Sequence, residues 1–216
     1  MHIDSDSEVG RVRRLGVAGT QLEIETLDRL DSVVECPHFG VLWPSAIALS
    51  EHLRSRADSQ PIPSNVLELG CGLAIPSMIA SRLGARRVVA TDRHPAVSRL
   101  LRRNAACNGL SRIEYRNLDW RKIGDRADRY QCPLGFDFVM GSDLLYEPWQ
   151  PGALANLLAN LLERGAEALI ADPGRRYVDE FVRLMEAAQF RCDLEAVRTV
   201  QHGGAAVDVL LVAVRA

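Results

Sequence analysis

The stretch Val66-Leu67-Glu68-Leu69-Gly70-Cys71-Gly72 joins a short apolar run to two glycines, and a helical pattern follows it through about Leu83. An apolar run of this length before a turn predicts a buried strand of a parallel sheet. Gly70 and Gly72 allow a tight turn in which the backbone closely approaches a ligand. A strand, a glycine turn and a helix in this order predict a site for a nucleotide-type ligand at the carboxyl end of the strand.

The rest of the chain repeats this alternation of strands and helices. Further strands are expected at residues 87–92, 112–116, 136–140 and 168–172, and helices at residues 95–107, 150–164 and 176–188. This rhythm predicts an α/β fold with a mostly parallel sheet that helices cover on both faces. Two strand-like runs at residues 190–200 and 206–214 end the chain. They predict a hairpin, so the last strand should run antiparallel to its neighbours.

A separate N-terminal region precedes this pattern. Residues 11–27 alternate around Gly16 and Gly19 and predict a β-hairpin outside the main sheet, after a polar tail. Residues 28–38 are expected to form a short helical or irregular link. We therefore divide the chain into an extension at residues 1–38 and a cofactor-binding domain at residues 39–216.

The bulk composition is that of an ordinary globular protein. Of 216 residues, 47% are hydrophobic and 25% are charged, and the formal net charge is -2. This balance implies neither a nucleic-acid partner nor a membrane surface, and no apolar run approaches the length of a membrane span. The five cysteines form no CxxC pair, so no metal site is expected. Reduced thiols and a polar, acidic N-terminus favour a cytoplasmic location.

The residues around the glycine turn indicate which ligand it binds. A dinucleotide-binding turn has the pattern G-x-G-x-x-G, but Ile75 stands at the third glycine position and argues against a pyrophosphate. Glu68 lies inside the apolar strand, where an unpaired carboxylate is costly. A cationic ligand group would satisfy it, and S-adenosylmethionine carries both an ammonium and a sulfonium. The alternative is that Glu68 pairs with a local arginine or backbone amides and that the glycines only form a turn.

Carboxylates at the ends of the next two strands extend this site. Asp92 follows Gly72 by twenty residues, and a carboxylate there can accept hydrogen bonds from both ribose hydroxyls. NAD-dependent enzymes use the same device, and Asp92 is alternatively a helix N-cap. Past the third strand, Asp119 can read the adenine edge, with the apolar Trp120 against the adenine face. The segment Asn117-Leu118-Asp119-Trp120 is alternatively a plain turn.

The loop Gly141-Ser142-Asp143-Leu144-Leu145-Tyr146-Glu147 follows the fourth strand and should lie beside the glycine turn. Ser142 then borders the methyl donor, and Asp143 and Tyr146 are candidates for the substrate side. If the acceptor is an amine, its nitrogen needs a free lone pair, whereas a carboxylate beside it favours the cation. We therefore assign Asp143 to positioning and charge complementarity. Asp143 is alternatively a helix cap.

Several of these motifs together resemble one family. The motifs are Trp43-Pro44-Ser45-Ala46, Glu68 to Gly72, Asp92, Asn117 to Trp120 and Asp143-Leu144-Leu145-Tyr146. In this combination the chain is similar to the seven-β-strand protein lysine methyltransferases, often called methyltransferase family 16, from about Phe39 to the C-terminus. The glycine turn is common to class I methyltransferases in general. The Trp-Pro segment and the Asp-x-x-Tyr motif narrow the resemblance to this group.

The resemblance implies a Rossmann-like, seven-stranded sheet with strand order 3-2-1-4-5-7-6, in which strand 7 is antiparallel. It implies S-adenosylmethionine as the cofactor and methyl transfer to a lysine side chain of a protein substrate. Trp43 would pack near the cofactor, for which core packing is the alternative, and Asp143 and Tyr146 would be the catalytic residues that border the acceptor. The turn Asp172-Pro173-Gly174-Arg175 is similar to the lysine methyltransferases of the electron-transfer flavoprotein β subunit, or is only a tight turn.

Other functions stay open on the residues alone. A small-molecule N-methyltransferase would share the fold and the cofactor site, and only its acceptor pocket would differ. A nucleic-acid base methyltransferase often carries Asn/Asp-Pro-Pro-Tyr/Phe after the fourth strand, whereas Leu144 and Leu145 stand here. An NAD-dependent oxidoreductase would usually need a substrate-binding region beyond the sheet. A noncatalytic Rossmann-like cofactor-binding protein is the alternative from another class.

Overall fold

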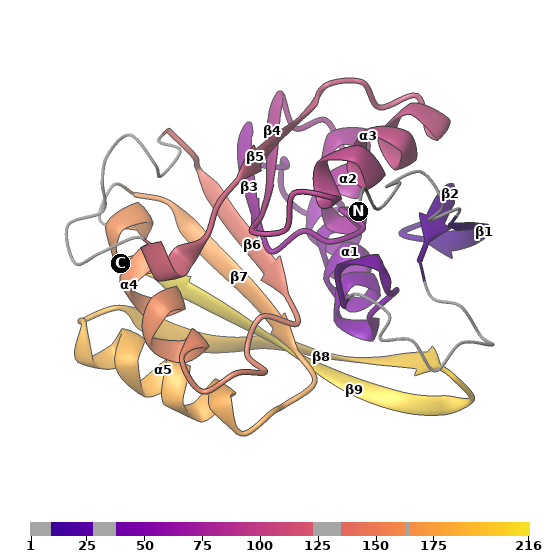
Figure 1. Ribbon diagram of the computed structural model, residues 1–216. Coiled ribbons are helices and arrows are strands. Elements are labelled where there is room, and N and C mark those ends of the chain that lie inside the picture. The colour runs from indigo at the N-terminus through magenta and orange to yellow at the C-terminus, as the bar shows by residue number, and fades with distance from the viewer. Residues whose placement is uncertain (1–9, 28–37, 123–134, 163–164) are drawn as a thin grey trace, which may run out of the picture.

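The computed structural model describes residues 10–27, 38–122, 135–162 and 165–216. Its main sheet has the spatial strand order β5-β4-β3-β6-β7-β9-β8 (Figure 1). The strands are β3 (Asn65–Leu69), β4 (Arg87–Asp92), β5 (Ile113–Asn117), β6 (Phe138–Ser142), β7 (Glu167–Asp172), β8 (Arg191–His202) and β9 (Ala205–Arg215). Counted from β3, this is the order 3-2-1-4-5-7-6, so the Rossmann-like fold expected from the sequence is confirmed.

Strand direction follows from the connections. Each of the pairs β3–β4, β4–β5, β3–β6 and β6–β7 is parallel. A parallel neighbour needs a crossover connection, and the intervening segments are long enough to supply one. β9 is antiparallel to both β7 and β8, because the tight turn at Gly203 and Gly204, which have φ values of 57° and 81°, reverses the chain directly. The C-terminal hairpin expected from the sequence is therefore present.

Neighbouring residues of the central strands enter two separate cores. Val66 packs into the core that contains residues of α1 (Pro44–Ala57), α2 (Ile75–Arg82) and α3 (Val97–Cys107). These three helices lie on one side of the sheet (Figure 1). Leu67 packs into the core on the side of α4 (Gln150–Leu162) and α5 (Tyr177–Ala187). Because both faces of these strands are buried, nearly every position must be apolar. This explains the continuous apolar run in the sequence around Glu68.

The N-terminal hairpin forms a two-stranded sheet of its own. It consists of β1 (Arg11–Val17) and β2 (Thr20–Thr26), joined at Ala18 and Gly19, which both have positive φ values of 52° and 70°. Two such residues make the mirror-image turn whose twist matches an antiparallel pair. The hairpin therefore lies outside the main sheet, as the sequence predicts. The link at residues 28–37 lies outside the described residues, and His38 opens a short 3-10 helix, His38–Gly40.

The hairpin nevertheless shares a core with the sheet. Leu22 and Ile24 are buried in the same apolar cluster as α1, α2 and α3. Asn104 on α3 accepts a hydrogen bond from the backbone N–H of Glu25 at 2.8 Å and donates to its carbonyl oxygen at 3.3 Å. Asn108 binds the backbone of β2 in the same way one helical turn later. The side chains of Asn104 on α3 and of Asn108 at its C-cap thus take the place of a third strand along the edge of β2.

Within these described ranges, no helix is both long enough and apolar enough to cross a membrane.

Asn104→Ala should destabilise the fold, because it leaves the buried backbone N–H and carbonyl of Glu25 without partners. We expect the free energy of unfolding to fall by roughly 2 kcal/mol, which lowers the melting temperature by about 4–8 °C. Thermal denaturation followed by circular dichroism measures this. Arg102→Ala, on the exposed face of the same helix, is the control, and equal melting temperatures of the two variants would show that the asparagine does not hold the hairpin.

Candidate active site

The carboxyl ends of five neighbouring strands meet at one cavity. Asp119 follows β5, Asp92 ends β4, Gly70 follows β3, Asp143 follows β6 and Arg175 follows β7, and all five line the cavity. The strand order reverses between β3 and β6, which is the switch point at which parallel sheets bind ligands. The cavity has a volume of about 380 Å³, within the range of small-molecule sites.

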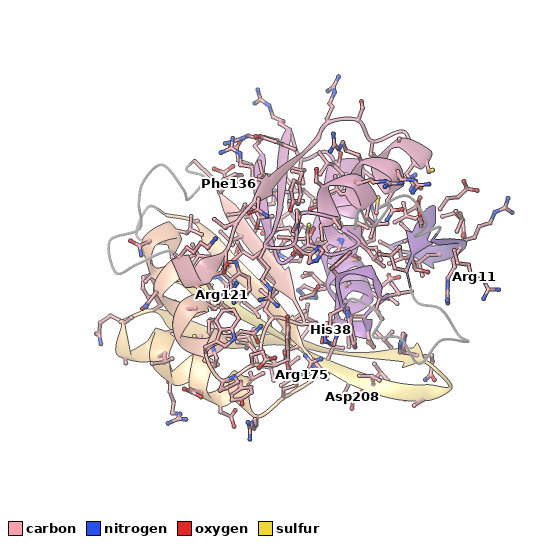
Figure 2. The ribbon with its side chains drawn as sticks, in the orientation of Figure 1. Arg11, His38, Arg121, Phe136, Arg175 and Asp208 are labelled. Carbon is pink, nitrogen blue, oxygen red and sulfur yellow. The ribbon has the colours of Figure 1, made fainter. Side chains whose placement is uncertain are left out.

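A sixth segment closes the cavity from the N-terminal side. His38, Phe39 and Trp43 lie before or at the start of α1, and they line the cavity together with the strand ends. In Figure 2, His38 and Arg175 lie in the same region beside the ends of the central strands, although they are 137 positions apart in the chain. The ring centroids of Phe39 and His94 stack at 4.2 Å. Both aromatic rings and carboxylates therefore line the cavity.

The glycine turn is a left-handed cradle. Gly70 and Gly72 have φ values of 60° and 48°, and Ala74 follows with 57° before α2 begins. A Cβ on Gly70 would lie 2.6 Å from the Leu144 side chain, and one on Gly72 would lie 3.0 Å from the carbonyl oxygen of Phe39. Both the backbone angle and the lack of space thus require glycine. The backbone forms one wall of the cavity, where a ligand can approach it closely.

The Asp92 carboxylate ties this cradle to β4. Its Oδ2 accepts the backbone N–H of Gly72 at 3.1 Å, and its Oδ1 accepts the backbone N–H of His94 at 2.9 Å. Burial raises the pKa of Asp92, although these two hydrogen bonds oppose the rise. Each oxygen keeps a further lone pair for a ligand hydroxyl. The alternative role as a helix cap is wrong, because Ala96 stands at the N-cap of α3 without a side-chain cap bond.

Glu68 differs from the other predicted cofactor residues because it is not among the residues that line the cavity. Its Oε2 accepts hydrogen bonds from the backbone N–H of Ser77, at 3.0 Å, and from the Ser77 hydroxyl. The alternative in which backbone amides satisfy Glu68 is therefore right for this oxygen. Its Oε1 is buried and has no partner among the described residues. Burial raises the pKa of Glu68 to about 8, against the opposing hydrogen bonds from Ser77.

The end of β5 brings Asp119 and Trp120 to the cavity, as the sequence predicts. The Arg121 guanidinium forms two hydrogen bonds with the Asp119 carboxylate, at 2.9 and 2.7 Å, and holds the pKa of that carboxyl below its usual range. Trp120 is buried, and its ring lies 6.4 Å from that of Trp149. An anionic acceptor and a flat apolar surface therefore stand side by side, which suits the edge and the face of a purine base.

The end of β6 brings Ser142, Asp143 and Tyr146 to the cavity. Asp143 is a buried residue with a left-handed φ of 56°. Its Oδ1 lies 2.6 Å from Nη2 of Arg175, and its Oδ2 has no hydrogen-bond partner in the described part of the chain. Asp143 is therefore not a helix cap. Tyr146 is 41% exposed at the rim, and its backbone N–H donates to Gln150 at 2.6 Å.

Trp43 stands at the mouth of the cavity rather than deep in a core. It occupies the N-cap position of α1, and its ring N–H donates to the carbonyl oxygen of His38 at 2.9 Å. The His38 ring in turn lies 6.1 Å from the Trp43 ring and 6.0 Å from the Tyr146 ring. These contacts link the predicted cofactor residue Trp43 to the predicted catalytic residue Tyr146 through a residue that the sequence did not single out.

Arg175 is the main site residue to which the sequence assigned no role. It lines the cavity and pairs with both Asp143 and Asp172. Burial raises the pKa of Asp172, and the hydrogen bonds and charge of Arg175 oppose this. Burial alone would lower the pKa of Arg175, but the two carboxylates raise it instead. Arg175 was visible in the sequence as part of the turn Asp172-Pro173-Gly174-Arg175. Its contact with Asp143 becomes visible only because β6 and β7 are adjacent in the sheet.

Within residues 10–27, 38–122, 135–162 and 165–216, no group of three or more His, Cys, Asp or Glu side chains is placed to hold a metal ion.

Comparisons with known proteins give one family. The model of a family described as lysine methyltransferase matches residues 25–188. The fold agrees with solved structures. TYW2 of P. horikoshii, in complex with MeSAdo, superposes with a TM-score of 0.60 over 97% of this chain and 72% of its own, at 14% sequence identity. At this identity the likeness shows the fold alone.

Three curated relatives illustrate the range of acceptors. The protein N-terminal and lysine N-methyltransferase EFM7 of Eremothecium gossypii is 29% identical over 77% of this chain and 67% of its own. The histone-arginine methyltransferase METTL23 of Mus musculus is 28% identical over 56% and 46%. The electron transfer flavoprotein beta subunit lysine methyltransferase of Xenopus laevis is 30% identical over 64% and 53%. The chain thus spans about half to two thirds of the length of these relatives.

Glu68→Gln should change how stability depends on pH. Because the pKa of Glu68 is raised from 4.5 to about 8 on folding, the folded protein holds a proton between these values that the unfolded chain has lost. This group therefore lowers stability as pH rises through that window, at roughly 1 kcal/mol per pH unit. Glutamine has no proton to lose, so the variant should gain stability relative to the parent protein from about pH 4.5 to 8.

Chemical denaturation at a series of pH values measures this difference. Glu114→Gln is the control, because the Glu114 side chain is 46% exposed and pairs with Arg116 on β5. A constant difference between Glu68→Gln and the parent protein across the series would mean that Glu68 is ionised in the folded state at neutral pH.

Proposed function

The chain belongs to the lysine methyltransferase family, and from this premise we propose that it uses S-adenosylmethionine to methylate a lysine side chain of a protein. One observation carries the proposal. The ends of β3, β4 and β5 line a cradle with acceptors for a nucleoside, and the end of β6 brings the Asp143 carboxylate to the same cavity, beside Arg175 after β7. Oδ2 of Asp143 has no partner among the described residues, so it favours a cation or hydrogen-bond donor beside the place where the nucleoside would end.

The donor half of the cavity fits S-adenosylmethionine. Asp92 has a free lone pair on each oxygen for the ribose hydroxyls. Gly70 and Gly72 keep the wall flat enough for close approach. We assign the adenine to Asp119 and Trp120, for the reasons of charge and shape given above.

The remaining cofactor residues surround this core of the site. Trp43 and Ser142 line the cavity on either side of the glycine turn. We keep Glu68 among the cofactor residues because its buried Oε1 has no partner among the described residues. It supports the turn from behind the cavity wall, through Ser77 at the start of α2.

The acceptor half must bind a lysine and also let it lose its proton. When bound, S-adenosylmethionine supplies an electrophilic methyl group, so that a neutral amine forms the new N–C bond while the C–S bond breaks and the positive charge passes from sulfur to nitrogen. A free lysine has a pKa of about 10.4, so the neutral form costs roughly 4–5 kcal/mol at pH 7. Asp143 attracts the ammonium and holds the nitrogen in place. The gain in rate then comes mainly from alignment.

Tyr146 and Asp143 have different positions in this scheme. Tyr146 is 41% exposed at the rim, where it can meet the chain that carries the lysine. Asp143 is 8% exposed, so it meets only the end of a side chain that enters the cavity. A protein substrate suits this depth, since a lysine has a long unbranched stem below its amine. A cytoplasmic location belongs to the same proposal, because Cys71, Cys107 and Cys192 are free thiols.

Three alternatives are weaker. An NAD-dependent enzyme would usually have a third glycine in this turn, but Ile75 stands in that place, with its side chain buried and lining the cavity. A small-molecule methyltransferase would share the donor half, and only the identity of the labelled product separates it from the present proposal. A noncatalytic binding protein would bind the cofactor without transferring its methyl group.

S-adenosylmethionine should raise the melting temperature of the protein, and NAD at the same concentration should not, because the turn lacks the third glycine of a dinucleotide-binding site. Differential scanning fluorimetry with both ligands measures this. Stabilisation by NAD alone would exclude the proposed cofactor.

Asp92→Asn should weaken the binding of S-adenosylhomocysteine by roughly 10- to 100-fold, because charge-assisted hydrogen bonds to the ribose are lost. Isothermal titration calorimetry gives the dissociation constant. Asp137→Asn is the matched control, since Asp137 lies at the opposite end of the strands, where it accepts hydrogen bonds from Asn65. Unchanged affinity in Asp92→Asn would mean that the ribose lies elsewhere.

Asp143→Ala should abolish methyl transfer while S-adenosylhomocysteine still binds, because Asp143 lies on the acceptor side of the cavity. Incubation of a host-cell lysate with tritiated S-adenosylmethionine, followed by hydrolysis and separation of methylated amino acids, measures transfer to lysine. Glu147→Ala, an exposed residue of the same loop, is the control. Label in the small-molecule fraction would favour the alternative acceptor class, and full activity of Asp143→Ala would remove Asp143 from the mechanism.

A further inference from the structure

Two buried carboxylates and one guanidinium meet where β6 and β7 end. Nη2 of Arg175 lies 2.6 Å from Oδ1 of Asp143, and Nη1 lies 3.0 Å from Oδ2 of Asp172. The backbone N–H of Arg175 also donates to Oδ1 of Asp172, at 2.8 Å. Arg175 thus bridges the ends of two neighbouring strands, and it is labelled beside the cavity in Figure 2.

The side chain of Arg175 occupies a site that is suited to a guanidinium. A guanidinium presents its donors as a planar fork, and it binds most strongly where carboxylate oxygens face two of its nitrogens. Asp143 and Asp172 form such a place, and the side chain of Arg175 occupies it. The guanidinium of a substrate would find these oxygens already taken. Two carboxylates and one guanidinium still leave one negative charge, so the cluster can hold one further cation.

One oxygen of the cluster is available for that cation. Oδ2 of Asp143 is buried and accepts no hydrogen bond from any described residue. The Asp143 side chain is 8% exposed and lines the cavity. A buried carboxylate oxygen without a partner costs free energy, which a donor on a ligand would offset. A single oxygen matches the compact ammonium or amine of a lysine, whereas the fork of an arginine needs two.

The backbone fixes this oxygen. Asp143 has a left-handed φ of 56°, which is uncommon for a residue other than glycine. Its N–H donates to the carbonyl oxygen of Ala171 on β7 at 2.9 Å. Gly174, with a φ of 78°, turns the chain after β7 so that Arg175 points back to Asp143. A left-handed angle at a residue other than glycine persists where the surrounding contacts require it, and Asp143 takes this angle at the acceptor end of the cavity.

We propose that Arg175 determines acceptor specificity: it fills the place of a substrate guanidinium and leaves Oδ2 of Asp143 as the receptor for an amine. The site then takes the amine of lysine and excludes the guanidinium of arginine. This inference rests on the proposed function, because it concerns the acceptor end of the same cavity. Arg175 acts by filling this place and by holding Asp143 in position, so that of these two residues only Asp143 contacts the acceptor amine.

The first test measures the amine receptor without a protein substrate. Sinefungin carries a primary amine where S-adenosylmethionine carries its methyl group, and S-adenosylhomocysteine carries no group there. Calorimetry gives the ratio of their affinities for the parent protein and for Asp143→Asn. The parent protein should prefer sinefungin, and Asp143→Asn should reduce this preference by about tenfold or more, because a charge-assisted hydrogen bond is lost. An unchanged ratio would overturn the assignment of Oδ2 as the receptor.

The second test asks whether methylguanidine, in the absence of any nucleoside, binds between Asp143 and Asp172 once the Arg175 side chain is removed. At 10 mM, roughly ten times an assumed dissociation constant, methylguanidine should raise the melting temperature of Arg175→Ala by about 3–6 °C more than that of the parent protein. Methylamine at the same concentration should have a smaller effect. Arg175→Lys should resemble the parent protein, because its ammonium keeps the place filled. Equal shifts in Arg175→Ala and the parent protein would overturn the inference.

Two further variants make the result specific. Arg176→Ala is the matched control, because Arg176 stacks on Tyr177 and is not among the residues that line the cavity. It should show no added shift with methylguanidine. The double variant Asp143→Asn/Arg175→Ala should lose most of the shift that Arg175→Ala gains, since one of the two carboxylates is gone. A shift kept in full by the double variant would place methylguanidine elsewhere and contradict the proposal.

The outcomes distinguish a failure of the proposed function from a failure of the role proposed for Arg175. If neither sinefungin nor S-adenosylhomocysteine binds the parent protein, the proposed function fails, while the methylguanidine measurement still decides what Arg175 occupies. If both nucleosides bind and methyl-arginine is the main product in a labelled lysate, the cofactor assignment stands, and both the lysine acceptor and the role of Arg175 are overturned.

Discussion

The hydrogen bond from the Gly72 backbone to the Asp92 carboxylate is the contact on which the rest of the site depends. It joins the turn after β3 to the end of β4, and the other oxygen of Asp92 holds the next turn through His94. Gly70, Gly72 and Ala74 adopt left-handed angles between these anchors. Without the carboxylate the backbone N–H of Gly72 would lose this partner. The same residue can then bind a ribose, because two backbone hydrogen bonds use only half of its capacity.

Burying carboxylates at one edge of the sheet costs free energy, and hydrogen bonds from neighbouring residues offset part of it. Burial raises the pKa of Glu68, Asp92 and Asp172, and in each case hydrogen bonds oppose the rise. Ser77 does this for Glu68, and Arg175 does it for Asp172. Two oxygens of the group, on Glu68 and Asp143, have no partner among the described residues. Unsatisfied buried acceptors are rare in folded proteins, and the one on Asp143 belongs to a residue that lines the cavity, where a ligand could complete it.

The strand order of the sheet brings residues that are far apart in the chain side by side along the cavity. Asp119, Asp92, Gly70, Asp143 and Arg175 follow five strands that lie side by side in that sequence. A nucleoside would therefore lie across β5, β4 and β3, and its reactive end would point toward β6 and β7. Under the proposed function, this topology would separate the donor half of the cavity from the acceptor half, so the acceptor half could change without disturbing cofactor binding. In this chain the acceptor half contains an internal guanidinium, which sets it apart from a simple pair of carboxylates.

The sequence alone determined the strands, the glycine turn and the residues that end the strands. A buried parallel strand must be apolar on both faces, so Val66 to Leu69 and the later runs were visible, and a hairpin at the C-terminus followed from its glycines. The tertiary structure decided the partners. Glu68 was visible as an unusual carboxylate, but Ser77 becomes its partner only when α2 folds back over β3. Arg175 was visible only as part of a turn, because its contact with Asp143 spans 32 positions. That contact requires β6 and β7 to be adjacent and Asp143 to have a left-handed φ. No local pattern of residues predicts either condition.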